Sequence, residues 1–280
     1  MLVVFCYYSR MERNFNKLTK VPYKPFPSVD DYDLYVDNQG DVCFLKHDAL
    51  TTERSYLLEI DGRSMVPRDG LLMTKLLSDI VFGKRVLDLG TGGGVLAIHS
   101  AVFGASIIVA TDIDINALES ARNNGSINNI NNIEWLSSDL FLELKNRKFD
   151  LILSNPPQLP MPSGLVQDSG GSNGRMLVEK IISEAPAYLD TSGMLLMVLF
   201  DFLGIDESYS DTPPLRELFR ANGFDLEIVT REKSPVRKGG QTEKNTDHIL
   251  RQYPKYKFEV CDGKIIHEKL LIKAQLAHRF

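Results

Sequence analysis

Cysteines, long apolar runs and secretion signals are scarce or missing in this chain of 280 residues. The three cysteines, Cys6, Cys43 and Cys261, are odd in number and far apart, which excludes a disulfide framework and a Cys-x-x-Cys metal site. No apolar run reaches the ~18 residues that suggest a transmembrane helix, and the apolar start, residues 1–8, is too short for a signal sequence. We therefore expect a cytoplasmic protein in a reducing compartment that does not contact a membrane.

Motifs of common hydrolases and metalloenzymes are also missing. The five histidines show no His-Glu-x-x-His spacing, and the chain has no Gly-x-Ser-x-Gly turn. The net charge of −5 gives no reason to expect general nucleic-acid binding. We predict no bound metal, and 43% hydrophobic residues suffice for one α/β core with a small appendage.

The most informative stretch is Asn155-Pro156-Pro157, directly after residues 149–154, which are predicted to form a buried strand. Two prolines cannot continue a central strand because proline lacks a backbone donor. Asn155 and the Pro156 carbonyl are therefore expected at the carboxyl end of a strand, where open α/β sheets bind ligands. Together these two acceptors suit an amino or amide nitrogen. The alternative is a simple Asn-Pro turn that ends the strand.

A glycine-rich turn, Gly90-Thr91-Gly92-Gly93-Gly94, follows a second predicted strand, residues 85–89, and precedes a predicted helix. Glycines let a ligand approach the backbone closely, and a helix N-terminus carries partial positive charge. The spacing Gly92-x-Gly94-x-x-Ala97 also fits the relaxed dinucleotide-binding pattern. Asp88 argues against that interpretation, because a carboxylate two residues before the first glycine suits a cationic amino-acid group better than a pyrophosphate.

Further acids follow the next two predicted strands. Asp112 lies 22 residues after Gly90, and an acid about 20 residues on can accept both ribose hydroxyls. Asp114 is expected to cap the next helix. Asp139 either accepts from an adenine amine or is an ordinary loop acid. His99 is expected to be a packed helix side chain, not a catalytic base.

In this order, the motifs VLDLGTGGG, ATDID, SSDLF and SNPPQ resemble class I S-adenosylmethionine-dependent methyltransferases. More narrowly, they resemble the HemK/PrmC branch, the release-factor glutamine methyltransferases. Residues 170–175 (GGSNGR) and 66–68 (VPR) resemble two further segments of that branch, and the resemblance covers residues 64–230. It implies a Rossmann-like α/β fold, in which a seven-stranded, mostly parallel sheet has helices on both faces.

The resemblance also implies a cofactor, S-adenosyl-L-methionine, and a set of site residues. Asp88 and the glycine turn would hold its methionine part, Asp112 its ribose, and Asp139 with Leu140 its adenine. The residues implied to bind the cofactor are Asp88, Gly90, Thr91, Gly92, Gly94, Asp112, Ile113, Asp139, Leu140 and Asn155. The catalytic segment is Asn155, Pro156 and Pro157, which would aim a substrate nitrogen at the sulfonium methyl. Gln158 and Arg68 would contact the substrate.

Two departures from the family keep the methyl acceptor open. The residue after Asn-Pro-Pro is normally aromatic, whereas Gln158 cannot stack on a planar amide. Residues 33–37 and 41–45 predict a hairpin around the turn 38–40, where the family has a helical bundle. We expect a β-rich substrate-recognition or accessory region at 1–62 and the methyltransferase domain at 63–280.

The acceptor is expected to be an amide or amine of a protein or small molecule. Because plant methionine S-methyltransferases have a related domain with Asn-Pro-Pro-Gln, a thioether or small amino acid stays open, as does a nucleic-acid base. Two other classes remain. A nicotinamide oxidoreductase would use the glycines and Asp112 but not residues 155–157, and a non-catalytic module would bind the cofactor without transferring its methyl group.

Two segments have less specific predictions. The long insert at 231–264 carries eight basic and three acidic residues between 231 and 257. We expect either a mobile, solvated loop or a lid or docking surface for an acidic partner. The asparagine-rich residues 123–132 are expected to form a tolerant loop between a helix and a strand.

Overall fold

The fold is described by a computed structural model, in which residues 19–20, 32–36, 42–47, 55–60, 70–162 and 169–277 are placed. The chain divides into two compact units. The first comprises residues 1–84 and 91–139, and the second residues 85–90 and 140–280. The predicted boundary after residue 62 stays a prediction. Within these placed ranges, no helix is long and apolar enough to cross a membrane.

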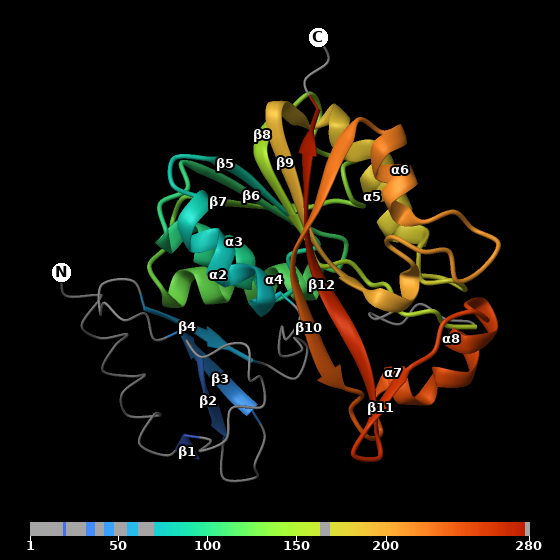
Figure 1. The fold of residues 1–280 in the computed structure, drawn as a ribbon. Helices are drawn as coiled ribbons and strands as arrows, with labels where there is room; N and C mark the ends of the chain where they lie inside the picture. The colour runs from blue at the N-terminus through green and yellow to red at the C-terminus, as the bar shows by residue number, and fades with distance from the viewer. Residues whose placement is uncertain are drawn as a thin grey trace. The chain divides into compact units, whose positions relative to one another are not determined.

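The first unit contains a small antiparallel sheet and alternating helices and strands (Figure 1). Its elements are β1 (Thr19–Lys20), β2 (Tyr32–Val36), β3 (Val42–His47), β4 (Tyr56–Glu59), α2 (Leu71–Ile80), α3 (Val95–Val102), β6 (Ile107–Asp112), α4 (Ile115–Ile127) and β7 (Ile133–Ser137). β2 and β3 pair antiparallel, as the hairpin prediction requires. Its turn, residues 38–40, lies outside the described residues. β6 and β7 are parallel neighbours.

The second unit contains most of the large sheet and the C-terminal elements. These are β5 (Arg85–Leu89), β8 (Phe149–Ser154), α5 (Met176–Glu184), η2 (Ala185–Ala187), β9 (Leu189–Phe200), η3 (Asp201–Leu203), α6 (Leu215–Ala221), β10 (Phe224–Pro235), α7 (Gln241–Lys244), α8 (Thr246–Gln252), β11 (Glu259–Cys261) and β12 (Lys264–Leu276). β5, β8 and β9 are parallel, while β12 pairs antiparallel with both β9 and β10. The strand order of the sheet is β10-β12-β9-β8-β5-β6-β7, with β11 beside β12. The expected mostly parallel sheet flanked by helices is confirmed, but it has eight strands where seven were expected, because the insert adds β11 beside β12.

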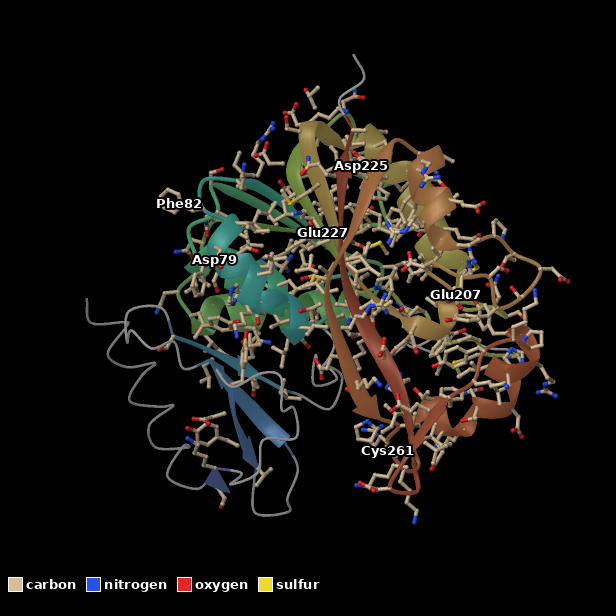
Figure 2. All side chains as sticks on the ribbon, viewed as in Figure 1. Asp79, Phe82, Glu207, Asp225, Glu227 and Cys261 are labelled. Carbon is tan, nitrogen blue, oxygen red and sulfur yellow. The ribbon has the colours of Figure 1, made fainter. Side chains whose placement is uncertain are left out.

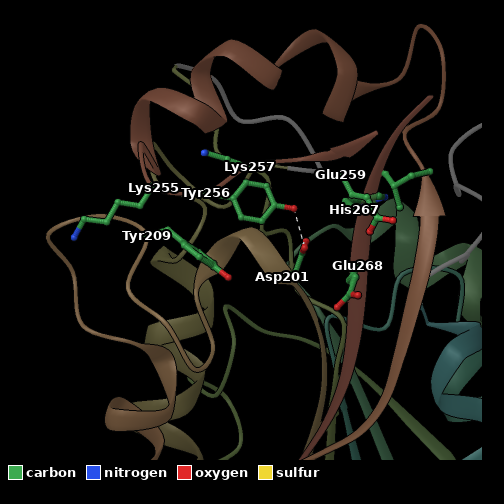
Figure 3. A pocket seen from close by; sticks show the side chains of 9 residues that line it. Asp201, Tyr209, Lys255, Tyr256, Lys257, Glu259, His267 and Glu268 are labelled. Atoms are coloured by element: carbon green, nitrogen blue, oxygen red, sulfur yellow. Dashed lines mark hydrogen bonds between the residues drawn. The ribbon is translucent and has the colours of Figure 1, made fainter. Parts of the chain in front are cut away.

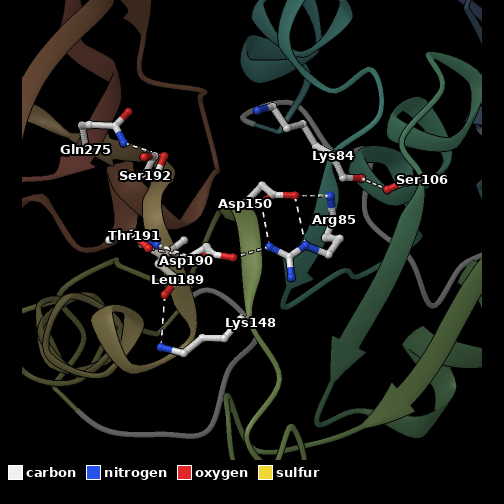
Figure 4. Close-up of polar contacts among 10 residues, drawn as sticks. All are labelled: Lys84, Arg85, Ser106, Lys148, Asp150, Leu189, Asp190, Thr191, Ser192 and Gln275. Atoms are coloured by element: carbon white, nitrogen blue, oxygen red, sulfur yellow. Dashed lines mark hydrogen bonds and ion pairs between the residues drawn. The ribbon is translucent and has the colours of Figure 1, made fainter. Parts of the chain in front are cut away.

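A charged cluster fixes the starts of three parallel strands in the second unit. The Arg85 backbone amide donates to the Asp150 carboxylate at 2.8 Å, and the Arg85 guanidinium contacts both Asp150 and Asp190 (Figure 4). These contacts lower the pKa of Asp190 to about 2, the hydrogen bond from Arg85 being the largest cause. Since these residues begin or precede buried strands, the cluster aligns β5 with β8, and Leu89 then lies opposite Ser154.

The insert is not a mobile, solvated loop, and that expectation was wrong. β10 extends to Pro235, and α7, α8 and β11 fill most of the remainder. Ile249, Tyr253 and Tyr256 are buried. His248 Nε2 lies 2.8 Å from the Ser172 carbonyl, and the Tyr253 hydroxyl donates to the Asn173 carbonyl. Burial of these three apolar side chains gives the insert a small core.

The asparagine-rich segment was also misjudged, because much of it belongs to α4. Asn124 is buried, and its Oδ1 accepts the Glu59 amide at 2.8 Å while its Nδ2 donates to the Glu59 carbonyl. Asn128, one turn later, makes the equivalent pair of bonds with Leu57. The two amides satisfy the backbone of β4 as a neighbouring strand would. Asn124 Nδ2 also donates to the Gly93 carbonyl at 3.0 Å, in the glycine turn.

We predict that Asn124→Ala lowers the free energy of unfolding by about 1–3 kcal/mol, because it leaves half-buried backbone groups of Glu59 without partners. Urea denaturation followed by circular dichroism measures the change. The matched control is Asn131→Ala, which removes the same amide from an exposed position. Equal midpoints for the two variants would show that the Asn124 bonds add nothing to stability.

Candidate active site

The glycine turn in the first unit is held by a carboxylate. Gly92 has φ +53 and Gly94 φ +87, a region that favours glycine. A Cβ on Gly94 would meet Ala121 Cβ at 3.0 Å, so the close packing of α3 on α4 also requires glycine there. The Gly92 amide donates to Asp112 Oδ2 at 2.9 Å. α3 begins directly after this turn, at Val95, and directs its positive end toward it.

Asp112 and Asp139 come together at one edge of the first unit. β6 and β7 run parallel with Asp112 opposite Ser137, and the Ser138 amide donates to the Asp112 carbonyl at 3.0 Å. Asp139 therefore follows at the same carboxyl edge and is exposed. Asp112 Oδ1 accepts the Asp114 amide at 3.0 Å. The expected helix cap is confirmed, since Asp114 accepts the Asn116 amide at 2.9 Å.

Apolar surface lies beside these acids. Ile113, next to Asp112, is 70% exposed, which is unusual for isoleucine and leaves a flat apolar face at the strand end. Leu140, next to Asp139, has φ +48, a conformation that side chains other than glycine rarely adopt. Thr91 is buried, and its amide donates to the Thr111 carbonyl at 2.8 Å. The predicted cofactor roles of these residues stay predictions.

In the second unit, the ends of β5 and β8 bring two predicted site segments to one edge. Leu89 lies opposite Ser154, and the Ser154 hydroxyl donates to the Leu89 carbonyl at 2.9 Å. Gly90 and Asn155 are the next residues of the two strands, so they leave the sheet side by side. Asp88, also on β5, is 1% exposed.

Asn155 and Gln158 lie three residues apart but differ in burial and in hydrogen bonding. Asn155 is half-buried, and its side-chain amide has no hydrogen-bond partner among the residues that the structure places. Gln158 is buried and fully engaged. Its Nε2 donates to the Val198 carbonyl at 2.8 Å and the Pro156 carbonyl at 3.2 Å, and its Oε1 accepts the Phe200 amide at 2.8 Å.

This arrangement changes the interpretation of two predicted site residues. The side chain of Gln158 points into the protein and ties the Asn-Pro-Pro segment to the end of β9. Its predicted contact with the substrate stays untested, but both ends of its amide already have partners within the chain. The Pro156 carbonyl keeps one lone pair for a substrate, since a carbonyl oxygen has two. Arg68 lies outside the described residues.

The turn at residues 170–175 supports the same segment. A Cβ on Gly170 would lie 2.6 Å from Gln158 Cα, and one on Gly174 would lie 2.4 Å from the Gln158 carbonyl oxygen. Arg175, which ends the turn, is buried and donates to Glu179, Thr212 and the Pro213 carbonyl. Two glycines are therefore needed because the turn touches the backbone of Gln158.

His99 has the structural role expected for it. It is 1% exposed and stacks on Phe103 with ring centroids 4.3 Å apart. Its Nδ1 lies 2.9 Å from the Tyr56 hydroxyl and its Nε2 3.0 Å from the Ser78 hydroxyl. Both ring nitrogens therefore have hydrogen-bond partners within the first unit.

The fold is that of class I methyltransferases. A solved structure of the YcgJ protein from Bacillus subtilis superposes with a TM-score of 0.52 at 15% identity, covering 75% of this chain and 99% of that one. A Bacillus halodurans structure, provisionally described as a methyltransferase, gives a TM-score of 0.50 at 22% identity and covers 73% and 98%. At these identities, the two structures establish the fold alone.

The chain belongs to the methyltransferase small domain family, whose pattern matches residues 69–226. It is therefore a methyltransferase, which overturns the oxidoreductase alternative. The usual cofactor of this class is S-adenosylmethionine.

Among its relatives, a Methanocaldococcus jannaschii protein provisionally named protein N5-glutamine methyltransferase is 37% identical over 60% of this chain and 83% of its own length. The release factor glutamine methyltransferase of Francisella tularensis is 30% identical over 52% of this chain. The ribosomal protein uL3 glutamine methyltransferase of Xylella fastidiosa is 35% identical over 49%. The chain spans about half the length of these last two relatives, 53% and 49%.

We predict that Gln158→Leu lowers the free energy of unfolding by about 2 kcal/mol or more, because the half-buried Phe200 amide loses its acceptor and the Val198 carbonyl its donor. Differential scanning calorimetry of the purified variant measures this. Gln241→Leu, at the half-exposed start of α7, is the matched control. A variant as stable as that control would mean that Gln158 does not hold the end of β9.

Proposed function

We propose that this chain transfers the methyl group of S-adenosylmethionine to the side-chain amide nitrogen of a glutamine in a protein substrate. The observation that carries the proposal is the Asn155 amide, which stands at the carboxyl end of β8 without a partner among the placed residues. Its oxygen and the second lone pair of the Pro156 carbonyl can accept the two N–H bonds of a primary amide. The names of the M. jannaschii, F. tularensis and X. fastidiosa relatives support glutamine as the acceptor.

The cofactor would be held by the residues that the motifs single out. Asp88 and the Gly90–Gly94 turn would contact the methionine part, and Asp112 the ribose hydroxyls. Two features of the first unit support this assignment. Asp112 is already oriented by backbone amides, and the exposed face of Ile113 suits one side of a planar ring. Asp139 and Leu140 would lie at the edge of the adenine.

Catalysis in this proposal consists of positioning. The sulfonium is a good leaving group, so a nitrogen held in line with the methyl carbon can attack it directly, and orientation supplies much of the rate increase. An amide nitrogen is a weak nucleophile because its lone pair is delocalised into the carbonyl. Two acceptors that bind its hydrogens draw electron density toward nitrogen and hold the lone pair toward the methyl group. The methyl carbon–sulfur bond breaks as the carbon–nitrogen bond forms, and the amide then loses a proton.

We predict that Asn155→Ala abolishes transfer but leaves cofactor affinity within about threefold of wild type, a difference under 1 kcal/mol. Tritium transfer from labelled S-adenosylmethionine to glutamine peptides and to a cell extract separated by size measures activity. Isothermal titration calorimetry measures affinity. Asn131→Ala is the control. A large loss of cofactor binding in Asn155→Ala would contradict the assigned role, and label appearing only in nucleic acid or small molecules would contradict the protein acceptor.

We predict that S-adenosylmethionine raises the thermal midpoint whereas NAD does not, because only a ligand that binds the native state stabilises it. Differential scanning fluorimetry with each compound at equal concentration tests this. Asp112→Ala is expected to lose the shift, since it removes both the proposed ribose acceptor and the bond to Gly92. An equal shift with both compounds would contradict the assigned cofactor.

A further inference from the structure

The second unit contains a cavity of about 380 Å³ that none of the predicted site residues lines (Figure 3). Three segments form it: the turn after β9, residues 255–259 of the insert, and residues 266–268 of β12. It lies at the carboxyl end of β9. Since β9 runs parallel to β8, this is the sheet edge at which Asn155 follows Ser154. The insert therefore builds a binding-sized space near the acceptor side of the proposed active site.

Asp201 forms the inner polar surface of the cavity. Its Oδ2 accepts the Tyr256 hydroxyl at 2.7 Å (Figure 3). Its Oδ1 is inaccessible to solvent and accepts no hydrogen bond from any residue that the structure places. Interactions with the backbone amides of Phe202 and Glu268 lower the pKa of the carboxylate and partly offset the effect of burial. A buried oxygen of this kind is costly unless a ligand donates to it.

Burial and nearby carboxylates act together on three ionisable groups of the cavity, Asp201, Tyr209 and Tyr256. Burial raises the pKa of Asp201, and the charge of Glu268 adds to this effect. Burial also raises the pKa values of Tyr209 and Tyr256, and the nearby carboxylates act in the same direction. A cation bound among these groups would lower all three pKa values.

The basic residues around the cavity do not supply that cation. Lys255 and Lys257, which line the cavity, are both exposed, and Lys255 extends away from it in Figure 3. His267 also lines the cavity, and its buried ring packs against Phe200 with ring centroids 5.0 Å apart. Arg231 pairs with Glu268 at 3.2 Å, and Lys233 pairs with Glu259. Within the described ranges, no basic side chain lies within ion-pair distance of Asp201.

We propose that this cavity binds a basic side chain, arginine or lysine, of the protein substrate. The guanidinium or ammonium group would donate to Asp201 Oδ1, and its charge would lie against the rings of Tyr209 and Tyr256. The identification of the ligand as part of a protein substrate rests on the proposed function. The cation-binding property does not.

The position of the cavity connects it with acceptor binding. Gln158 accepts the Phe200 amide, and Asp201 is the next residue along the chain. The Gln158 side chain therefore fixes both the segment that presents the substrate nitrogen and the residue that would bind the basic side chain. A substrate glutamine with an arginine or lysine nearby can contact both, which makes Asp201 a specificity-determining residue.

Direct binding tests the cavity without any need for methyl transfer. The probe is Nα-acetyl-arginine amide, and its uncharged counterpart is Nα-acetyl-citrulline amide, both titrated into the full chain and followed by NMR. We expect wild type to bind the arginine probe at least about tenfold more tightly than the citrulline probe, a preference of the size that a charge-assisted hydrogen bond provides. Asp201→Asn keeps the shape and the bond from Tyr256, and it is expected to lose this preference.

Two further variants make the result specific. Asp225→Asn removes a carboxylate from an exposed position at the start of β10 (Figure 2) and should leave the preference unchanged. Tyr256→Phe keeps the ring and frees Asp201 Oδ2, so it should retain the preference. If Asp201→Asn does not fold, the arginine and citrulline comparison on wild type and Tyr256→Phe still decides. Equal binding of the two probes by wild type, or an unchanged preference in Asp201→Asn, would overturn the proposal.

A methyl-transfer assay is the second test of the proposal. Glutamine peptides with arginine at successive positions on either side are compared with citrulline-containing counterparts. We expect kcat/KM to rise at least about tenfold for arginine at a preferred position in wild type but not in Asp201→Asn. If wild type methylates no glutamine peptide yet binds the arginine probe selectively, the proposed function fails and the cation site stands. If it methylates both peptides of every pair equally, the cation site fails and the proposed function stands.

Discussion

The carboxamide of Gln158 is the contact on which the acceptor side of this protein depends. After Ser154 the chain leaves the sheet, whereas the neighbouring β9 continues to Phe200. The backbone groups of those last β9 residues need partners that β8 no longer provides. Gln158 supplies both kinds, accepting from Phe200 and donating to Val198. One side chain thus replaces the missing end of a strand.

This role leaves little freedom to the segments around it. The backbone of Gln158 is packed so closely that the turn at 170–175 must have glycine at 170 and 174. The insert packs on that turn, because His248 and Tyr253 contact the carbonyls of Ser172 and Asn173. The Asn-Pro-Pro-Gln segment, the glycine turn and the insert are therefore one packed structure. A substitution at Gln158 is expected to disturb the packing of all three segments.

The contrast between two amides explains how one short loop can be both rigid and reactive. The Gln158 amide is saturated, so it holds the backbone in place. The Asn155 amide has no partner among the placed residues, so its hydrogen-bonding capacity remains for a ligand. An aromatic residue at position 158 could not make the bonds to Val198 and Phe200. The substitution of glutamine therefore exchanges a stacking surface for a structural support.

The sequence predicts those features that depend on neighbours in the chain. The buried strands, the glycine turn, the hairpin of β2 and β3 and the Asp114 cap all follow from local patterns. The roles of Gln158 and Asn124 could not be predicted, because their partners lie 42 and 65 residues away. The insert resembled a loop because its apolar residues are few and irregularly spaced, yet Ile249, Tyr253 and Tyr256 suffice to give it a small core. Asp201 gave no signal beyond being an acid after a strand.

The basic insert favours an acidic partner, whereas the carboxylate in the cavity favours a basic side chain. Burial determines which of these two charges acts at short range. The insert is basic over residues 231–257, but its lysines and arginines are largely exposed or paired with acids. Exposed charges are screened by salt within about 10 Å. Asp201 is screened less, because it is half-buried beside Tyr256 and its Oδ1 is closed to solvent. A long-range preference for an acidic partner is therefore compatible with a cavity that admits only a basic side chain. The charge of the insert affects how fast a substrate associates, and the cavity determines which residue the substrate must contain.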